Sequence, residues 1–348
     1  MRSLYRWSGQ FAVPIAALAL GGTLGLSGCK DKITPTPPTI GSQVPKSATT
    51  AATLSRPIAA ALSPDAKTVY VTAFDSNGQA QLYSGPAGGA LTVVASSMPL
   101  SYPCSIAVTS DGTKLLIADL GDAGGGGPTG AVYTSSTTGT LTALTTGTPQ
   151  YPTGVALSLD DSSAYVTGVD PTDGKPGVWQ IAVSGGGPVQ LYKGAPLVYP
   201  AGVTVSNDGG LYVADTSGLG ASQGAIFRIQ DSRAFQINKT PLRMHFPVGL
   251  APAGQGFPDL LITTAVALGV PNEPFVVRLS PDGTQQPLTL ALAGGTITEP
   301  TSIHRAAKTD SWIVVDAVVP AADLAGAPGV PDPAKLDNPD GRIIQLSP

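Results

Sequence analysis

The sequence predicts an all-β protein in which one structural unit is used six times. A phrase that opens on a proline recurs at intervals of 46 to 53 residues. Each phrase continues with two small residues and an aliphatic run, followed by a turn and a second apolar run. The opening residues are Pro57, Pro103, Pro152, Pro200, Pro247 and Pro300. Repeats of this length and content are typical of a β-propeller, so we expect six blades of four antiparallel strands in a ring.

The first 28 residues have the organisation of a secretory signal peptide. Two arginines precede an apolar stretch over residues 11–26, and the sequence Leu-Ser-Gly-Cys ends at Cys29. A membrane-spanning helix is disfavoured because Pro14 and several glycines interrupt a short run. The final four residues resemble the bacterial lipobox, which implies that Cys29 is the lipidated first residue of the mature protein. Because Lys30 and not aspartate follows, the resemblance implies an outer-membrane lipoprotein facing the periplasm or exterior.

Residues 29–47 are rich in proline, threonine and serine, and they predict an extended tether before a propeller over 48–348. The one other cysteine is Cys104, so we expect no intrachain disulfide. Cys104 occupies a repeat position that elsewhere holds Ile58, Thr153, Ala201, Val248 and Thr301. We therefore expect a buried small side chain, the alternative being a reactive thiol.

Composition limits the possible partners. Charged residues make up 12% of the 348 residues and the net charge is −4, so no basic stripe is available to neutralise phosphates. Nucleic acid is therefore excluded as a partner. We expect a monomer that meets the membrane through its lipid alone and binds an envelope protein or a small molecule.

The first strand of each unit alternates between bulky and small residues, as in Ile106 and Val108 against Ser105 and Ala107. Period two places the two sets on opposite faces, so the bulky face of one blade is expected to pack on the flat face of its neighbour. The last unit ends after its third strand. The threonine-rich segment 48–54 is the predicted fourth strand, and it would close the ring from the N-terminal end.

The repeat resembles NHL-repeat and gluconolactonase-like six-bladed propellers over residues 50–348. The resemblance implies a lactone or ester hydrolase that uses a divalent metal in the channel. Of the family's ligand positions, Asp215 is matched, in the phrase Leu-Tyr-Val-Ala-Asp. Arg56 stands at the position of the family's glutamate, and Thr153 and Ala201 replace asparagines, so the metal set is incomplete.

Six equivalent positions, each directly before an opening proline, are predicted to lie around one end of the channel: Arg56, Tyr102, Tyr151, Tyr199, Phe246 and Glu299. Such a ring of aromatics with one opposite-charge pair could stack a sugar, a flavonoid-like ring or an aromatic peptide side chain. The alternative is that each aromatic wedges between neighbouring blades.

Blade six departs from the repeat. His304 replaces the small residues of the other blades, and Arg305 replaces their aliphatic residues. With Glu299 and Arg56 they form the predicted polar group near the axis, either a ligand site or a buried ion-pair network. His304 and Asp215 are the catalytic candidates.

The other acidic residues give less specific predictions of a functional site. Asp119, Asp215 and Asp316 end the second strands of alternate blades, too far apart for one metal, and we expect each to accept backbone hydrogen bonds within its own blade. The insert 319–340 could bind calcium weakly through Asp323, Asp332, Asp337 and Asp340, or be a solvated loop. The sequence therefore favours a lipid-anchored binding or scaffolding module, with a metal-dependent lactonase or esterase as the alternative.

Overall fold

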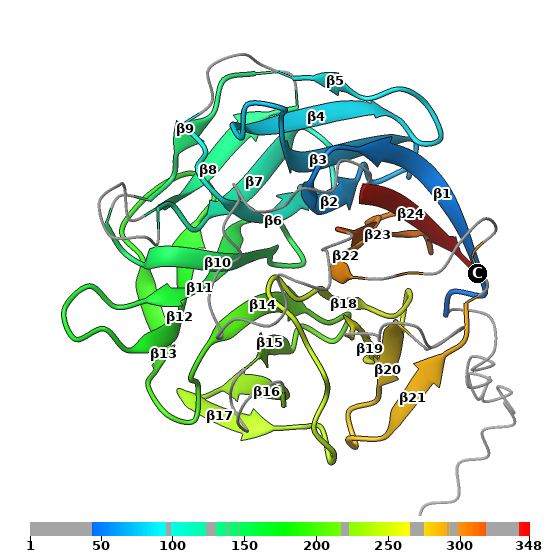
Figure 1. The fold of residues 1–348 in the computed structure, drawn as a ribbon. Helices are drawn as coiled ribbons and strands as arrows, with labels where there is room; N and C mark the ends of the chain where they lie inside the picture. The colour runs from blue at the N-terminus through cyan, green and yellow to red at the C-terminus, as the bar shows by residue number, and fades with distance from the viewer. Residues whose placement is uncertain are drawn as a thin grey trace, which may run out of the picture. The chain divides into compact units, whose positions relative to one another are not determined.

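The computed structural model describes residues 44–94, 99–122, 130–137, 139–145, 147–216, 223–264, 275–290, 292, 297, 299–317 and 341–348. They form six four-stranded antiparallel sheets around a central axis, as Figure 1 shows. The predicted six-bladed propeller is confirmed. The predicted signal peptide, Cys29 and nearly all of the tether lie outside the described residues. Within the described residues, no helix has the length and apolarity needed to span a membrane.

In blades one to five the innermost strand comes first in sequence and the outermost comes last. Blade one comprises β2 (Pro57–Leu62), β3 (Thr68–Phe74), β4 (Ala80–Pro86) and β5 (Thr92–Val93). Blade two comprises β6 (Pro103–Val108), β7 (Lys114–Asp119), β8 (Ala131–Ser136) and β9 (Thr142–Ala143). Blade three comprises β10 (Gln150–Leu157), β11 (Ser163–Val169), β12 (Pro176–Ala182) and β13 (Val189–Lys193). Blade four comprises β14 (Pro200–Val205), β15 (Leu211–Asp215), β16 (Ala225–Gln230) and β17 (Arg233–Gln236). Blade five comprises β18 (Leu250–Pro252), β19 (Leu260–Thr263), β20 (Val276–Leu279) and β21 (Gln285–Leu288).

Blade six is built from strands at both ends of the propeller sequence. Its strands are β22 (Pro300–Arg305), β23 (Trp312–Asp316), β24 (Gly341–Ser347) and β1 (Ser47–Leu54). β1 pairs antiparallel with β24 from Ser47 opposite Ser347 to Leu54 opposite Gly341, and Figure 1 shows the two strands side by side. The predicted closure is confirmed. It covers an edge of β24 that would otherwise present unpaired backbone groups.

Neighbouring blades pack through the alternation seen in the sequence. Ile106 and Val108 of blade two share one apolar cluster with Ala59 and Ala61 of blade one. Ala107, on the other face of the same strand, joins a cluster with Val155 of blade three. The bulky face of one innermost strand therefore packs on the flat face of the preceding one, as predicted.

The innermost strands approach one another backbone to backbone. A Cβ added to Gly202 would lie 2.6 Å from the carbonyl oxygen of Val248, and one added to Gly249 would lie 2.2 Å from the nitrogen of Ile303. Real Cβ atoms do not make such contacts, so glycine is required there because it has none. Threonines bridge other blades: Thr72 donates to the Pro103 carbonyl at 3.0 Å.

The turns that follow the innermost strands are joined to one another between neighbouring blades. Hydrogen bonds of 2.6 to 3.0 Å link Ser110 with Asp161, Asn207 with Phe257, Gln255 with Asp310 and Lys308 with Pro64. These bonds connect blades two and three, four and five, five and six, and six and one. The turns thus form a belt around one end of the central axis.

Candidate functional site

A cavity of about 280 Å³ runs between the innermost strands, and all six blades contribute to its wall. Most lining side chains are small and apolar, including Ala60, Ala107, Val155 and Ile303. The wall also includes residues of the turn belt, among them Leu159, which is 61% exposed. The cavity therefore extends to the end of the ring where the turns lie.

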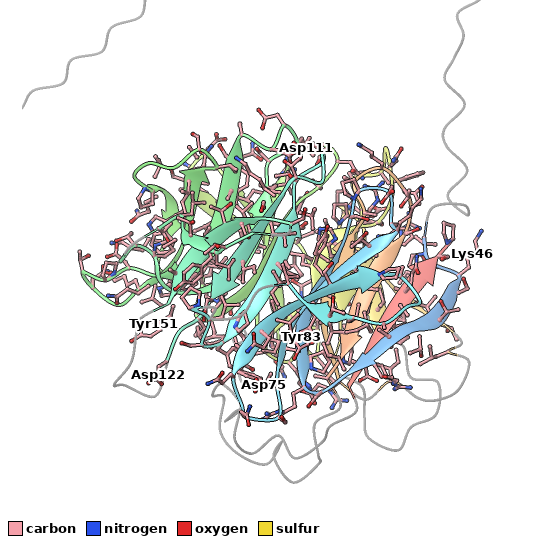
Figure 2. The ribbon with its side chains drawn as sticks, turned by 90° about the horizontal axis from the view of Figure 1, so that it is seen from above. Lys46, Asp75, Tyr83, Asp111, Asp122 and Tyr151 are labelled. Carbon is pink, nitrogen blue, oxygen red and sulfur yellow. The ribbon has the colours of Figure 1, made fainter. Side chains whose placement is uncertain are left out.

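The propeller has two distinct faces because all six innermost strands run in the same direction. We call the end before the opening prolines the proline face and the end bearing the turn belt the turn face. Figure 2 shows this separation: Asp111, in the turn after β6, lies at one face, and Tyr151 and Asp75 lie at the opposite one. Each predicted site residue can be assigned to one of these faces.

Aromatic side chains meet across the axis at the proline face. Tyr102 of blade two stacks on Phe246 of blade five with ring centroids 6.3 Å apart, although these blades stand opposite each other in the ring. Tyr199 of blade four meets Phe246 edge-on at 5.3 Å. Tyr151 packs half-buried against the cluster that contains Tyr102. We call these four side chains the aromatic layer, and whether it contacts a ligand stays a prediction.

Burial sets the chemistry of the aromatic layer. Tyr102 is 5% exposed, and desolvation raises the pKa of its hydroxyl far above the ordinary value, as it does for Tyr199. Both hydroxyls stay protonated. Cys104 lies beside them, with Sγ 3.2 Å from the Tyr102 carbonyl, and burial raises the pKa of its thiol well above its usual range. The prediction of a buried, unreactive Cys104 agrees with this environment.

Three buried aspartates hold the chain in place before the opening prolines. Asp119 accepts hydrogen bonds from the amides of Ser101 at 2.7 Å, Tyr102 at 2.8 Å and Gly121 at 2.8 Å. Desolvation nevertheless raises the pKa of this carboxyl. The prediction that each aspartate accepts backbone hydrogen bonds in its own blade is confirmed here.

The equivalent carboxylates of blades four and six act in the same way. Asp215 accepts from the amides of Val198 at 2.7 Å and Tyr199 at 3.0 Å, and Asp316 accepts from the Glu299 amide at 2.7 Å. Asp215 has no exposed surface. Its carboxylate therefore orients Tyr199, and the geometry offers no open face from which it could act on a substrate.

The carboxylate of Glu299 lies beside the imidazole of His245. The imidazole Nδ1 lies 3.2 Å from the Glu299 carboxylate, whose side chain is 6% exposed. The contacts of Arg56 include the Asp75 carbonyl and the ring of Phe74, 5.6 Å from its guanidinium carbon. The repeat pattern did not predict His245 at this site, because the equivalent positions stand directly before each opening proline and His245 stands two residues before Pro247.

His304 and Arg305 lie at the turn face, at the other end of β22 from Glu299. The prediction that His304 and Arg305 form one polar cluster with Glu299 and Arg56 is wrong. Six extended residues separate the ends of the strand by roughly 20 Å. Residues at equivalent positions of the repeats therefore lie at the same face of the ring, whereas residues at the two ends of one innermost strand lie at opposite faces.

His304 bridges the last and first blades. Its Nδ1 accepts a hydrogen bond from the Leu62 amide at 3.3 Å, so the ring proton is carried by Nε2. Burial, together with the nearby Arg305 charge, lowers the pKa of His304 to about 4. The imidazole is therefore neutral at pH 7, and it lines the cavity wall.

Arg305 also lines the cavity, and its side chain is 8% exposed. Its Nη2 donates to Asp310 at 3.0 Å, and Asp310 accepts the Gln255 amide as well. No group of three or more His, Cys, Asp or Glu side chains suited to a metal occurs among the described residues. The four aspartates of the acidic insert lie outside them.

Comparison with solved structures finds many propellers. A gluconolactonase from Xanthomonas campestris superposes with a TM-score of 0.54 at 13% identity, covering 88% of this chain and 89% of that one. An auxiliary nutrient binding protein from Bacteroides thetaiotaomicron gives 0.56 at 12%, covering 85% and 69%. A glucose dehydrogenase gives 0.56 at 10%, covering 87% and 99%. The shared feature is the fold.

No protein-family model and no curated protein matches the sequence. These three structures have three different descriptions. At identities of 10 to 13%, their similarity to this chain does not show which of the described functions, if any, it shares. Function has to be argued from the channel and the residues that line it.

Proposed function

We propose that this chain is a ligand-binding protein of the cell envelope that takes a small molecule into its central channel. The observation that carries the proposal is the cavity of about 280 Å³ within the ring. Its volume lies near the lower end of the range for small-molecule sites, and its wall combines apolar surface with a few polar groups. In this proposal the ligand enters at the turn face.

The predicted site residues divide into two roles. His304 and Arg305 provide the polar part of the wall in blade six. Tyr102, Tyr151, Tyr199 and Phe246 close the channel at the proline face, where Arg56 and Glu299 belong to the same end. These side chains are not among those that line the cavity, so the aromatic layer would close the channel beyond it as a rigid apolar barrier.

The lipobox and the proline-rich tether complete the proposal. A lipid on Cys29 would hold the domain at a membrane surface, and the extended tether would let it stand off that surface. Such a location suits the capture of a small molecule in the envelope, with no membrane insertion by the propeller itself.

The lactonase alternative requires Asp215 to reach a metal ion. Its side chain has no exposed surface, and one of its oxygens accepts two backbone amides. Bound calcium takes six to eight oxygen ligands, which a single carboxylate held in this way does not supply. The geometry therefore favours binding over hydrolysis.

A channel-filling variant tests the proposal. We would screen a library of small fragments by ligand-observed NMR against the full chain, and then repeat the screen with Ser105→Leu. Ser105 lines the cavity, is half-buried and accepts a hydrogen bond from the Val155 amide of blade three at 3.2 Å, so circular dichroism must first show that Ser105→Leu is folded. Ser136→Leu is the matched control, because Ser136 is exposed at the end of β8.

Fragments that bind the wild type and Ser136→Leu, but lose binding to Ser105→Leu, would support the channel. Fragments that bind all three proteins equally would refute it. Hydrolysis of lactones and aryl esters, assayed with Ca²⁺, Mn²⁺ or Zn²⁺, tests the lactonase alternative. Turnover that disappears in Asp215→Ala would replace the binding proposal with the lactonase.

A further inference from the structure

Arg305 is a buried cation with unused hydrogen-bonding capacity. Its side chain is 8% exposed, and Asp310 is its one hydrogen-bond acceptor among the described residues. The Nε atom is shielded from solvent and has no partner there. A buried donor without an acceptor is unfavourable, and an ordered water or a ligand near the guanidinium would relieve this cost.

The repeat itself shows that packing does not require this arginine. The same position holds Leu62, Val108, Leu157, Val205 and Pro252 in the other five blades. An aliphatic side chain therefore satisfies the fold at this place. Blade six carries a guanidinium where the cavity wall would otherwise be apolar.

His304 adds a second donor to the same wall. Four other blades have alanine at its position, namely Ala61, Ala107, Ala156 and Ala251. Because Nδ1 accepts the Leu62 amide, the N–H of His304 is on Nε2 and remains available to another acceptor. Two consecutive residues thus bring hydrogen-bond donors to one end of the cavity.

The charges around the cavity limit how much negative charge a ligand can carry. Arg305 and Asp161 are the charged residues among those that line it. Asp161 lies at the rim, where one of its oxygens accepts from the Ser110 amide at 2.7 Å and hydroxyl at 2.6 Å. Arg305 already shares its charge with Asp310, and Asp161 adds a second carboxylate, so the cavity suits a ligand with at most one negative charge.

From these observations we propose that the channel binds a small monocarboxylate, with the carboxylate held by Arg305 and His304 and the apolar body packed against the alanines and valines of the wall. The planar guanidinium suits carboxylate recognition, and among the described residues Asp310 occupies only its Nη2. This inference rests on the proposed function, since it assigns a ligand class to the same channel.

Butyrate and butyramide are the probes, since they differ little in size but only the first carries a charge. Binding to the full chain, purified in mild detergent, would be measured by saturation-transfer NMR and titration calorimetry. For about six non-hydrogen atoms a millimolar dissociation constant is a reasonable expectation. We expect butyrate to bind at least tenfold more tightly than butyramide.

Variants separate the role of Arg305 from general effects of losing an arginine. Arg305→Leu restores the residue of blade one and should weaken butyrate binding at least tenfold, while Arg305→Lys should weaken it less. His304→Ala restores the residue of four blades and should also weaken it. Arg228→Leu is the control: Arg228 lies on β16 over the ring of Tyr212, and it does not line the cavity.

The two proposals fail in different ways. If butyrate and butyramide bind equally, or Arg305→Leu binds butyrate like the wild type, the carboxylate site is refuted, and fragments blocked by Ser105→Leu would still support the channel. If neither probe binds, the carboxylate site is likewise refuted, and water completes Arg305. Should Arg305→Leu fail to fold, Arg305→Lys and the comparison of acid with amide still decide.

Discussion

The hydroxyl of Thr301 donates a hydrogen bond of 2.9 Å to the carbonyl of Ile58, two residues 243 positions apart in the chain. This bond joins the last innermost strand to the first. At the outer side of the same junction, β1 supplies the fourth strand of blade six. The ring is therefore closed twice between blades six and one, once near the axis and once through strand exchange.

Removal of β1 should open the ring. A chain that begins at residue 55 would leave β24 with an unpaired edge and expose the cluster in which Ala48 packs on Trp312 and Leu346. We expect loss of cooperative unfolding and aggregation, measured by circular dichroism and size-exclusion chromatography. A chain that begins at residue 40 retains Val44, which packs on that cluster, and Lys46, whose amide donates to the Ser347 carbonyl. It should behave as the full chain does, and equal behaviour of the two truncations would contradict this account.

Gly249→Ala should destabilise the propeller severely. Its Cβ would lie 2.2 Å from the Ile303 nitrogen and 2.5 Å from the Ser302 carbonyl carbon, both backbone atoms of blade six. Overpacking against backbone costs about 1–3 kcal/mol or more. Gly187→Ala is the control, because nothing lies within 4 Å of its Cβ position. Urea unfolding should separate the two variants clearly.

Asp119→Ala should loosen the proline face. The substitution leaves the amides of Ser101, Tyr102 and Gly121 without their acceptor. Unpaired buried donors cost about 1–3 kcal/mol each, so we expect a loss of several kcal/mol in the free energy of unfolding. Asp111→Ala, in an exposed turn, should have a much smaller effect. Similar midpoints for the two variants in chemical denaturation would argue against the anchoring role.

Acid should weaken the fold through His304. The pKa of this residue falls from the ordinary 6.5 to about 4 in the folded chain, so the unfolded chain binds more protons between these values. Its contribution is present above pH 6.5 and is lost as the pH falls toward 4. The shift corresponds to roughly 3 kcal/mol at most.

His304→Ala should flatten the stability profile between pH 6.5 and 4, as measured by urea unfolding at several pH values. His245→Gln serves as the comparison, since His245 is the other histidine of the chain. If His304→Ala keeps the slope of the wild type, the low pKa assigned to His304 is incorrect.

Tyr102 should matter more for stability than Tyr151. Tyr102 is 5% exposed and contacts Phe74 and Phe246, whereas Tyr151 is half-buried. Truncation of a buried aromatic costs about 3–5 kcal/mol, so Tyr102→Ala should lower the midpoint of thermal unfolding strongly. The double variant Tyr151→Ala, Tyr199→Ala tests the predicted ligand role. Weaker fragment binding with an intact fold would support it, and unfolding would support a packing role alone.

The repeat explains why the architecture could be predicted and the site only in part. Bulky and small residues alternate along each innermost strand, and the short-range pattern of Ile106, Ala107 and Val108 determines which face packs on which neighbour. Closure by β1 followed from counting strands in the last unit. Departures from the repeat, at His304 and Arg305, identified residues that line the cavity.

The sequence by itself determined the number of blades, the closure by β1 and the anchoring aspartates, because each depends on local pattern and on symmetry between repeats. Only the tertiary structure decided that Tyr102 meets Phe246 across the axis, that Glu299 pairs with His245 and that Arg305 stands at the opposite face. These contacts depend on ring diameter, on side-chain length and on the direction of β22. None of these quantities is encoded in the spacing of the prolines.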